Sequence, residues 1–176
     1  AEKWGVKVLS MGFFQESEDE AIIFRGPMIH NTITQFLEMT QWGELDYLIV
    51  DLPPGTSDAA LTVMQSLPLD GFITVAAPQE LARIDAMRSI NMVRKLNLPV
   101  VGIVENFTGD IFGSGAGELL ASEVGEPFLG KFQLRKAYRD TSKPTVLLDE
   151  EVRGEYVEVV ERMELALKEE STAETG

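Results

Sequence analysis

The stretch DYLIVDLPPGTSD, residues 46–58, carries the residue types best suited to chemistry in this sequence. Its apolar run predicts a buried strand that ends at Asp51. A carboxylate in that place can hold a water molecule on a Mg²⁺ ion, and Gly55 can bring a backbone N–H close to a terminal phosphate. Pro53 and Pro54 stiffen the turn between them. The pattern predicts the metal and phosphate side of a nucleotide site.

A structural interpretation fits the same residues. Asp51 can instead cap a helix that begins near Thr56 or Ser57, with the prolines ending the strand. The local pattern leaves both interpretations open.

Strands and helices alternate along the chain and predict what positions these residues. Strand-like apolar runs occupy residues 6–14, 45–52, 71–77, 100–104 and 128–132. Helical patterns occupy residues 29–39, 79–96, 118–123 and 150–170. This alternation predicts an α/β fold, a doubly wound, mostly parallel sheet with helices on both faces. Ligands of such sheets bind beyond the carboxyl ends of the strands.

Composition sets the class of protein. The length of 176 residues predicts a single α/β domain over residues 1–170, and the motif at residues 46–58 predicts that this domain binds nucleotide; residues 171–176 are expected to form a frayed tail. A net charge of −14 disfavours nucleic acid and anionic membranes as partners. The sequence has no cysteine, hence no disulfide and no thiolate ligand, and no long apolar run. We therefore expect a cytoplasmic protein.

The sequence resembles the Mrp/ApbC family of MinD-like P-loop ATPases, which carry iron–sulfur clusters. The resemblance begins near Val6 and ends near Asp149. It is carried by the segments VKVLSMGFF, FRGPMIHNTITQFL, WGELDYLIVDLPPGTSDAALTVMQSLPLDGFITVAAPQELARIDAMRSINMVRKLNLPVVGIVENFTG and DIFGSGAGELLASEVGEPFLGK. It implies a P-loop NTPase fold, ATP and Mg²⁺ as cofactors, an iron–sulfur cluster as cargo, a homodimer and client apoproteins as partners.

The resemblance also implies roles for single residues. Asp51 would organise Mg²⁺ through water, and Gly55 would sense the γ-phosphate, flanked by Pro53 and Pro54. Asn106, in the Glu-Asn pair, would contact adenine, since its carboxamide offers both a donor and an acceptor. Gln79 would face the nucleotide.

The sequence departs from the family pattern in three places. The lysine-bearing phosphate loop and the strand after it are absent. The one G-x-x-x-x-G-K match begins at Gly125, but Phe132 stands where the motif has a hydroxyl residue, so the match is better explained as a turn into a buried strand. The Cys-x-x-Cys pair between the Glu-Asn strand and DIFG is missing, so no cluster ligand remains. FQLR, residues 132–135, replaces Ile-Pro-Leu-Asp, which puts the adenine-side loop in doubt.

The first departure predicts that the fold is incomplete at its N-terminal side. Without the phosphate-loop strand, the Asp51 strand exposes unpaired backbone groups that invite another chain. We therefore expect an N-terminal phosphate-loop segment or a partner chain to complete the site. ATP hydrolysis is not expected without it.

Three functions compete. The first is an ATP-binding ATPase of the iron–sulfur cluster carrier class. The second is a MinD/ParA-like nucleotide switch, which the acidic charge disfavours. The third is a non-catalytic dimerisation or scaffold module of the same fold, which the missing phosphate loop favours.

Two further motifs have structural alternatives. GSGAG, residues 113–117, could form a nucleotide loop, but it lacks the third glycine of G-x-G-x-x-G and is better explained as a flexible start to the next helix. The basic group Lys131, Arg135, Lys136 and Arg139 could attract a nucleotide or an acidic partner, or form a solvated helix face.

Overall fold

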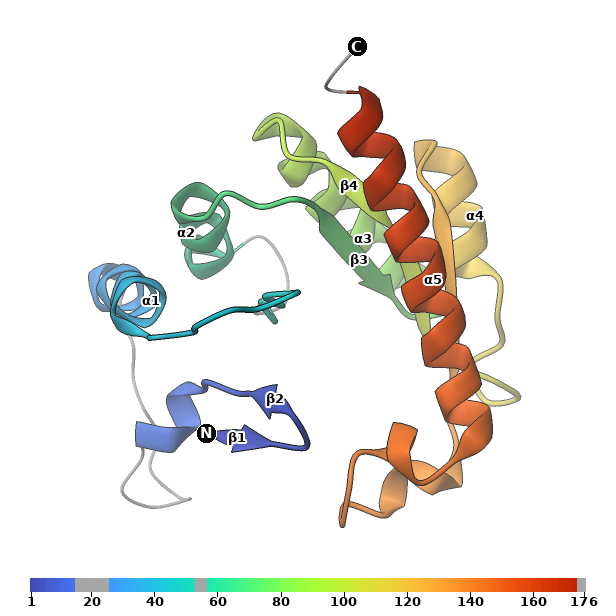
Figure 1. The fold of residues 1–176 in the computed structure, drawn as a ribbon. Helices are drawn as coiled ribbons and strands as arrows, with labels where there is room; N and C mark the ends of the chain where they lie inside the picture. The colour runs from blue at the N-terminus through green and yellow to red at the C-terminus, as the bar shows by residue number, and fades with distance from the viewer. Residues whose placement is uncertain (15–25, 53–56, 174–176) are drawn as a thin grey trace. The chain divides into compact units, whose positions relative to one another are not determined.

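The computed structural model describes residues 1–14, 26–52 and 57–173. The chain forms two compact units, Ala1–Pro68 and Leu69–Gly176, and each contains its own sheet (Figure 1). The single nucleotide-binding domain over residues 1–170 stays a prediction.

The first unit begins with a short hairpin. Trp4 and Gly5 form its turn with φ values of 51° and 77°, the left-handed pair that a two-residue hairpin turn requires. The elements of this unit are β1 (Glu2–Lys3), β2 (Val6–Lys7), the 3₁₀ helix η1 (Met11–Phe14), α1 (Gly26–Met39) and α2 (Asp58–Ser66). The prediction of one strand over residues 6–14 is wrong beyond Lys7, because this segment pairs only with β1 and then turns into η1.

The apolar segment before Asp51 differs from its prediction. Residues 45–52 lie in neither a strand nor a helix. Leu45, Tyr47, Leu48 and Ile49 are exposed, Ile49 to 85%. A strand exists only as a member of a pair, and the described part of this unit offers these residues no strand partner. The prediction of a buried strand here is therefore wrong for this structure.

Helix α2 shows how the chain continues after the Pro-Pro-Gly turn. Ser57 is its N-cap, and the Ser57 hydroxyl oxygen accepts a hydrogen bond from the Ala60 backbone N–H at 3.3 Å. Ala60, Val63 and Met64 bury the inner face of the helix. Because Ser57 fills the cap position, the structure gives no support to Asp51 as the cap of this helix.

The cap predicts a modest stability effect. Ser57→Ala removes the acceptor for one of the free N–H groups of the first turn, which costs about 1 kcal/mol at a helix N-terminus. Urea unfolding followed by the fluorescence of Trp4 and Trp42 measures it. Ser66→Ala, an exposed change at the other end of α2, should leave the midpoint unchanged. Equal shifts for both variants would contradict the capping role.

The second unit is a parallel sheet of three strands in the order β3-β4-β5. Its elements are β3 (Phe72–Ala76), α3 (Glu80–Lys95), β4 (Val100–Thr108), α4 (Ala116–Val124), β5 (Phe128–Gln133), the 3₁₀ helices η2 (Lys136–Arg139) and η3 (Thr145–Leu147), and α5 (Glu150–Ala173). The predicted alternation of strand and helix is confirmed from residue 71 onward, and the sheet is parallel as predicted.

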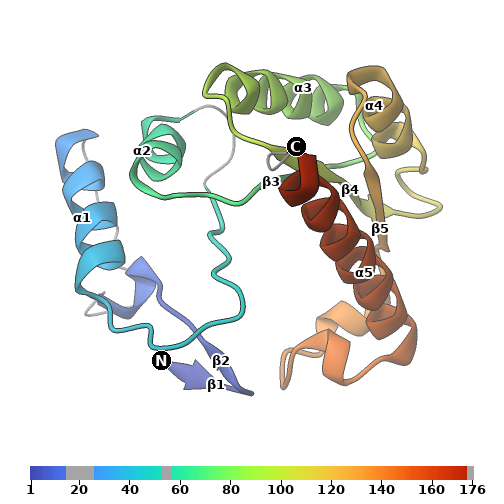
Figure 2. The same cartoon turned by 45° about the horizontal axis from the view of Figure 1, so that its top comes forward.

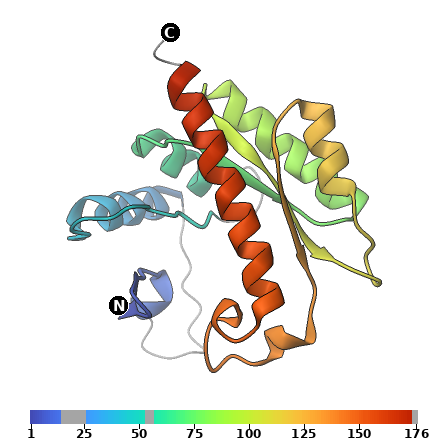
Figure 3. The ribbon, with the colours of Figure 1, turned by 45° about the vertical axis from the view of Figure 1, so that its right-hand side comes forward.

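Helices cover both faces of this sheet. Figures 2 and 3 show α3 and α4 on one face and α5 across the other. Ile103 and Leu129 are fully buried in β4 and β5, and Val159 of α5 packs on Leu129 and Val104. Runs that are apolar at successive positions form these strands because both faces are covered.

Helix α5 ends the described chain. It reaches Ala173, so residues 171–173, predicted as part of a frayed tail, are helical. Val152, Val159 and Ala166 of this helix are buried, and their spacing of seven residues places them on one face. In the described part of the chain, no helix is long and apolar enough to cross a membrane.

Candidate functional site

The carboxyl ends of the three parallel strands meet at one edge of the sheet. Ala76 of β3 is paired with Glu105 of β4, and Glu105 is paired with Lys131 of β5. The residues that follow each strand therefore leave the sheet on the same side. Gln79 lies there as the exposed N-cap of α3, and its side chain makes no capping hydrogen bond. This edge is the place where an α/β sheet binds ligands.

Asn106 sits at an irregularity in this edge. The pairing of β4 with β3 ends at Glu105, and its register with β5 shifts between Glu105 and Thr108. Phe107 has a φ of 62°, a left-handed conformation uncommon outside glycine. The Asn106 side-chain oxygen accepts the Phe107 backbone N–H at 2.9 Å. Such bulges re-aim side chains at functional sites.

The Asn106 carboxamide keeps capacity for a ligand. The residue is half-buried, and its oxygen has a second lone pair beyond the bond to Phe107. Its NH₂ group supplies two donors. A donor and an acceptor on one planar group can match the edge of a purine base.

Glu105 is a buried carboxylate next to Asn106. It is 0% exposed. Its two side-chain oxygens accept the backbone N–H groups of Gly115 at 2.9 Å and Gly117 at 3.1 Å, at the start of α4. A Cβ on Gly117 would lie 2.7 Å from the Glu105 Cβ, so only glycine allows this approach. The carboxylate thus fixes the helix to the strand that carries Asn106.

As predicted, one glycine-rich motif leads into a helix and the other forms a turn into a strand. Gly113 and Gly115 have φ values of 78° and 102°, and Gly115 is the N-cap of α4. The backbone N–H and C=O groups of Gly109 and Gly113 bond to each other and close the loop before the helix. Gly125 ends α4 with a φ of 73°, and the chain then enters β5. Gly115 and Gly125, one glycine from each motif, therefore form the turns at the two ends of α4.

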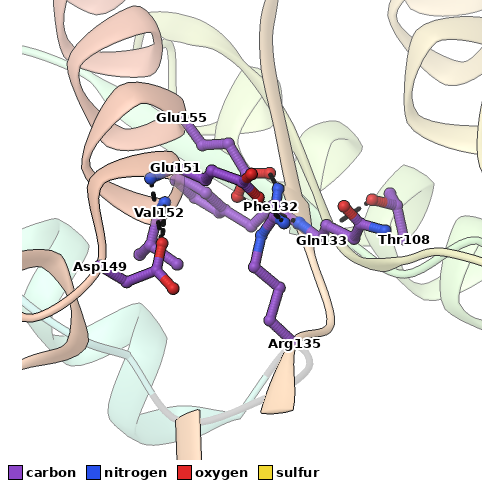
Figure 4. Close-up of polar contacts among 8 residues, drawn as sticks. All are labelled: Thr108, Phe132, Gln133, Arg135, Asp149, Glu151, Val152 and Glu155. Carbon is purple, nitrogen blue, oxygen red and sulfur yellow. Dashed lines mark hydrogen bonds and ion pairs between the residues drawn. The ribbon is translucent and has the colours of Figure 1, made fainter. Parts of the chain in front are cut away.

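The segment after β5 is bound to α5. Arg135 forms ion pairs with Glu151 at 2.5 Å and Glu155 at 2.6 Å (Figure 4). The hydrogen bond with Glu155, opposed by burial, raises the pKa of Arg135. Burial is the main cause that raises the pKa of Tyr138, and the electrostatic effect of Tyr156 adds to it. Arg135 is therefore engaged within the fold, whereas Lys131, Lys136 and Arg139 are exposed, so the four residues do not form one uniform basic surface.

The structure brings some of the predicted site residues together. Asn106 lies near the carboxyl end of β4, and Gln79 follows the adjacent strand β3, at one sheet edge in the second unit. Asp51 belongs to the first unit and is exposed. Pro53, Pro54 and Gly55 lie outside the described residues, so their predicted roles stay predictions. Among the described residues, no three His, Cys, Asp or Glu side chains are grouped so that they could hold a metal ion.

Two parts of the site were not anticipated from sequence. The cap made by Glu105 has a sequence signal, a carboxylate that ends an apolar strand shortly before GSGAG. The pairing of Arg135 with Glu155 has none, because 20 positions separate the two residues and only the packing of α5 on β5 brings them together.

Comparison with known proteins identifies the family of the chain. Residues 1–166 match the ParA family described as NUBPL iron-transfer P-loop NTPase. An iron–sulfur cluster carrier protein of Methanocaldococcus jannaschii is 42% identical over 92% of this chain and 60% of its own length. An iron–sulfur cluster transfer protein NUBPL of Dictyostelium discoideum is 40% identical over 80% of this chain and 46% of its own.

A solved structure shares the fold. It is the nucleotide-binding protein of Archaeoglobus fulgidus in complex with ADP, with a TM-score of 0.56 and 30% identity, covering 80% of this chain and 53% of that one. The present chain spans about 60% of the length of the first curated relatives that it matches. By its match over residues 1–166 and by these relatives, the chain belongs to the NUBPL iron-transfer P-loop NTPase family, to which iron–sulfur cluster carrier proteins are related.

Proposed function

We propose that this chain forms the adenine side of an ATP site in an iron–sulfur cluster carrier. The observation that carries the proposal is Asn106, held at the β4 bulge on the sheet edge where Gln79 also lies. The relatives named as cluster carriers and the ADP-bound neighbour support it.

The metal and phosphate side of the site belongs to the same proposal. Asp51, an exposed carboxylate, would hold Mg²⁺ through water, and Gly55 would approach the γ-phosphate. The sequence contains no complete lysine-bearing phosphate loop. We propose that polypeptide outside this sequence supplies it, from a preceding segment or a partner chain, and that hydrolysis depends on that supply.

The iron–sulfur cluster would be cargo. This sequence has no cysteine, and the described residues group no alternative ligands. The residues present do not fit a cluster site, so we assign none of them a step in cluster transfer. A cytoplasmic location, a homodimer and client apoproteins remain part of the proposal.

A titration with adenosine and ADP tests whether this chain binds the base while the phosphate loop comes from elsewhere. The amide and side-chain NH₂ signals of the ¹⁵N-labelled chain are followed by NMR, which detects weak binding. If this chain holds the base and not the phosphates, adenosine and Mg-ADP should bind with affinities within about threefold, because the phosphates find few donors here. Guanosine should bind more weakly. The shifts should centre on Asn106 and Gln79.

Two other results would count against the proposal. Tight binding of Mg-ADP together with weak binding of adenosine would place a phosphate cradle within this sequence. No binding of adenosine would remove the base site and favour the scaffold function.

Asn106→Asp is the sharpest variant for the base contact. Aspartate keeps the oxygen that accepts the Phe107 N–H but removes the NH₂ donors and adds a charge. We expect adenosine affinity to fall about tenfold, the worth of one or two hydrogen bonds. The same NMR titration measures the loss. Asn91→Asp, an exposed change on α3, is the control, and equal losses in both variants would contradict a specific contact.

A further inference from the structure

Helix α5 holds the segment that leaves β5 at the site edge. The guanidinium of Arg135 reaches two glutamates one helical turn apart, Glu151 and Glu155 (Figure 4). The Arg135 and Glu155 side chains are 23% and 19% exposed, whereas Glu151 is 76% exposed. The contact with Glu155 is therefore the better shielded of the two. A planar fork that contacts two carboxylates fixes orientation as well as distance.

Glu155 holds the backbone of the same segment. Its second oxygen accepts the Gln133 backbone N–H at 3.3 Å. Beside it, the rings of Tyr156 and Phe132 stack with centroids 4.3 Å apart. Residues of α5 thus contact the chain at Phe132 and Gln133, the last two residues of β5, and at Arg135 just beyond it.

Thr108 links the end of β5 to the end of β4. The Thr108 hydroxyl donates to the Phe132 carbonyl oxygen at 3.2 Å, and the Leu134 backbone N–H donates to the Thr108 carbonyl oxygen at 2.9 Å. Thr108 is 4% exposed and lies two residues after Asn106. A continuous set of contacts therefore leads from α5 through the β5 exit to the strand end that carries Asn106.

We infer that Arg135 and Glu155 are positioning residues for the base side of the nucleotide site. They fix the carboxyl ends of β4 and β5 relative to each other, so that the Asn106 carboxamide contacts the base in a fixed orientation. The inference rests on the proposed function. A purely structural pair would stabilise the unit without affecting which base binds.

The test compares two arginines with similar partners at opposite ends of β5. Arg135→Met removes the fork at the carboxyl end. Arg162→Met is the matched control, because Arg162 pairs with Glu158 on α5 at 2.5 Å and donates to the Phe128 carbonyl oxygen at the amino end of β5. Adenosine and guanosine affinities of the full chain are measured by NMR titration, and melting temperatures are recorded in parallel.

We expect Arg135→Met to lower the preference for adenosine over guanosine about fivefold, the worth of roughly one oriented hydrogen bond. The signals of Asn106 and Thr108 should move in the free protein. Arg162→Met should leave the preference within about twofold of the wild type. Glu155→Gln should act like Arg135→Met, and the double variant should lose no more than either single variant, because the two residues act as one unit.

The outcomes separate this inference from the proposed function. A lower melting temperature with an unchanged base preference would show a structural pair and overturn the inference alone. Equal effects from Arg135→Met and Arg162→Met, or additive effects of Arg135→Met and Glu155→Gln, would overturn it as well. Absence of adenosine binding by the wild type would overturn both.

Discussion

Replacing Glu105 with alanine is expected to lower the free energy of unfolding of the Leu69–Gly176 unit by about 3 kcal/mol or more. The change leaves the N–H groups of Gly115 and Gly117 without their acceptor. Each hydrogen bond to a charged group contributes about 1.5–3 kcal/mol, and a buried donor left unpaired costs its full desolvation. The carboxylate also lies at the positive end of the α4 dipole. Urea unfolding followed by far-ultraviolet circular dichroism measures the loss.

The control lies on the same helix. Glu118 is in the first turn of α4 but exposed, so Glu118→Ala should change stability by about 0.5 kcal/mol or less. Glu105→Gln separates charge from shape, because its NH₂ group would face one of the two N–H donors. We expect a loss between those of the other two variants. A Glu105→Ala protein as stable as the Glu118→Ala protein would show that the buried carboxylate does not hold the helix.

The Leu129→Ala variant is expected to lose about 2–5 kcal/mol of stability. Leu129 is 0% exposed near the start of β5, where it packs with Val104 of β4 and Val159 of α5. Removing its side chain loses the transfer free energy of the buried methyl groups and leaves a cavity that rigid strands cannot close. Since the cluster joins the sheet to α5, the circular dichroism signals of strands and helices should be lost together.

The matched change is Leu119→Ala on α4, where the side chain is 69% exposed. It removes the same atoms from a site that water already reaches. We expect a change of about 0.5 kcal/mol or less. Comparable losses at positions 119 and 129 would contradict the parallel sheet and its α5 cover.

The sequence predicted the second unit well because its signals are local. The stripe of Ile84, Met87, Ile90 and either Val93 or Met92 predicted α3. Ile90 and Val93 are fully buried, and the other three are half-buried. The run at residues 100–104 predicted β4, although the strand continues to Thr108 through the bulge. Periodicity reports which face is covered, but it does not report where a strand becomes irregular, because that depends on the neighbouring strand.

The first unit shows where such reasoning fails. Residues 45–52 have the composition of a buried strand, yet Ile49 is 85% exposed and no strand forms. An apolar composition predicts a strand only where neighbouring strands are present to pair with it, and composition does not show whether they are present. The candidate site divides in the same way. The resemblance named Asn106 and Gln79, whereas the pairing of Arg135 with Glu155 depends on a tertiary contact that no local pattern encodes.

The closed loop before α4 has a practical consequence. The backbone groups of Gly109 and Gly113 pair with each other, so residues 110–112 form a tip whose ends are fixed. Ile111 at this tip is 79% exposed, and the sequence contains no cysteine. Ile111→Cys would therefore introduce a unique thiol for a fluorophore, a few residues from Asn106 and outside the packed core. A label there would show whether adding adenosine changes the surroundings of this loop.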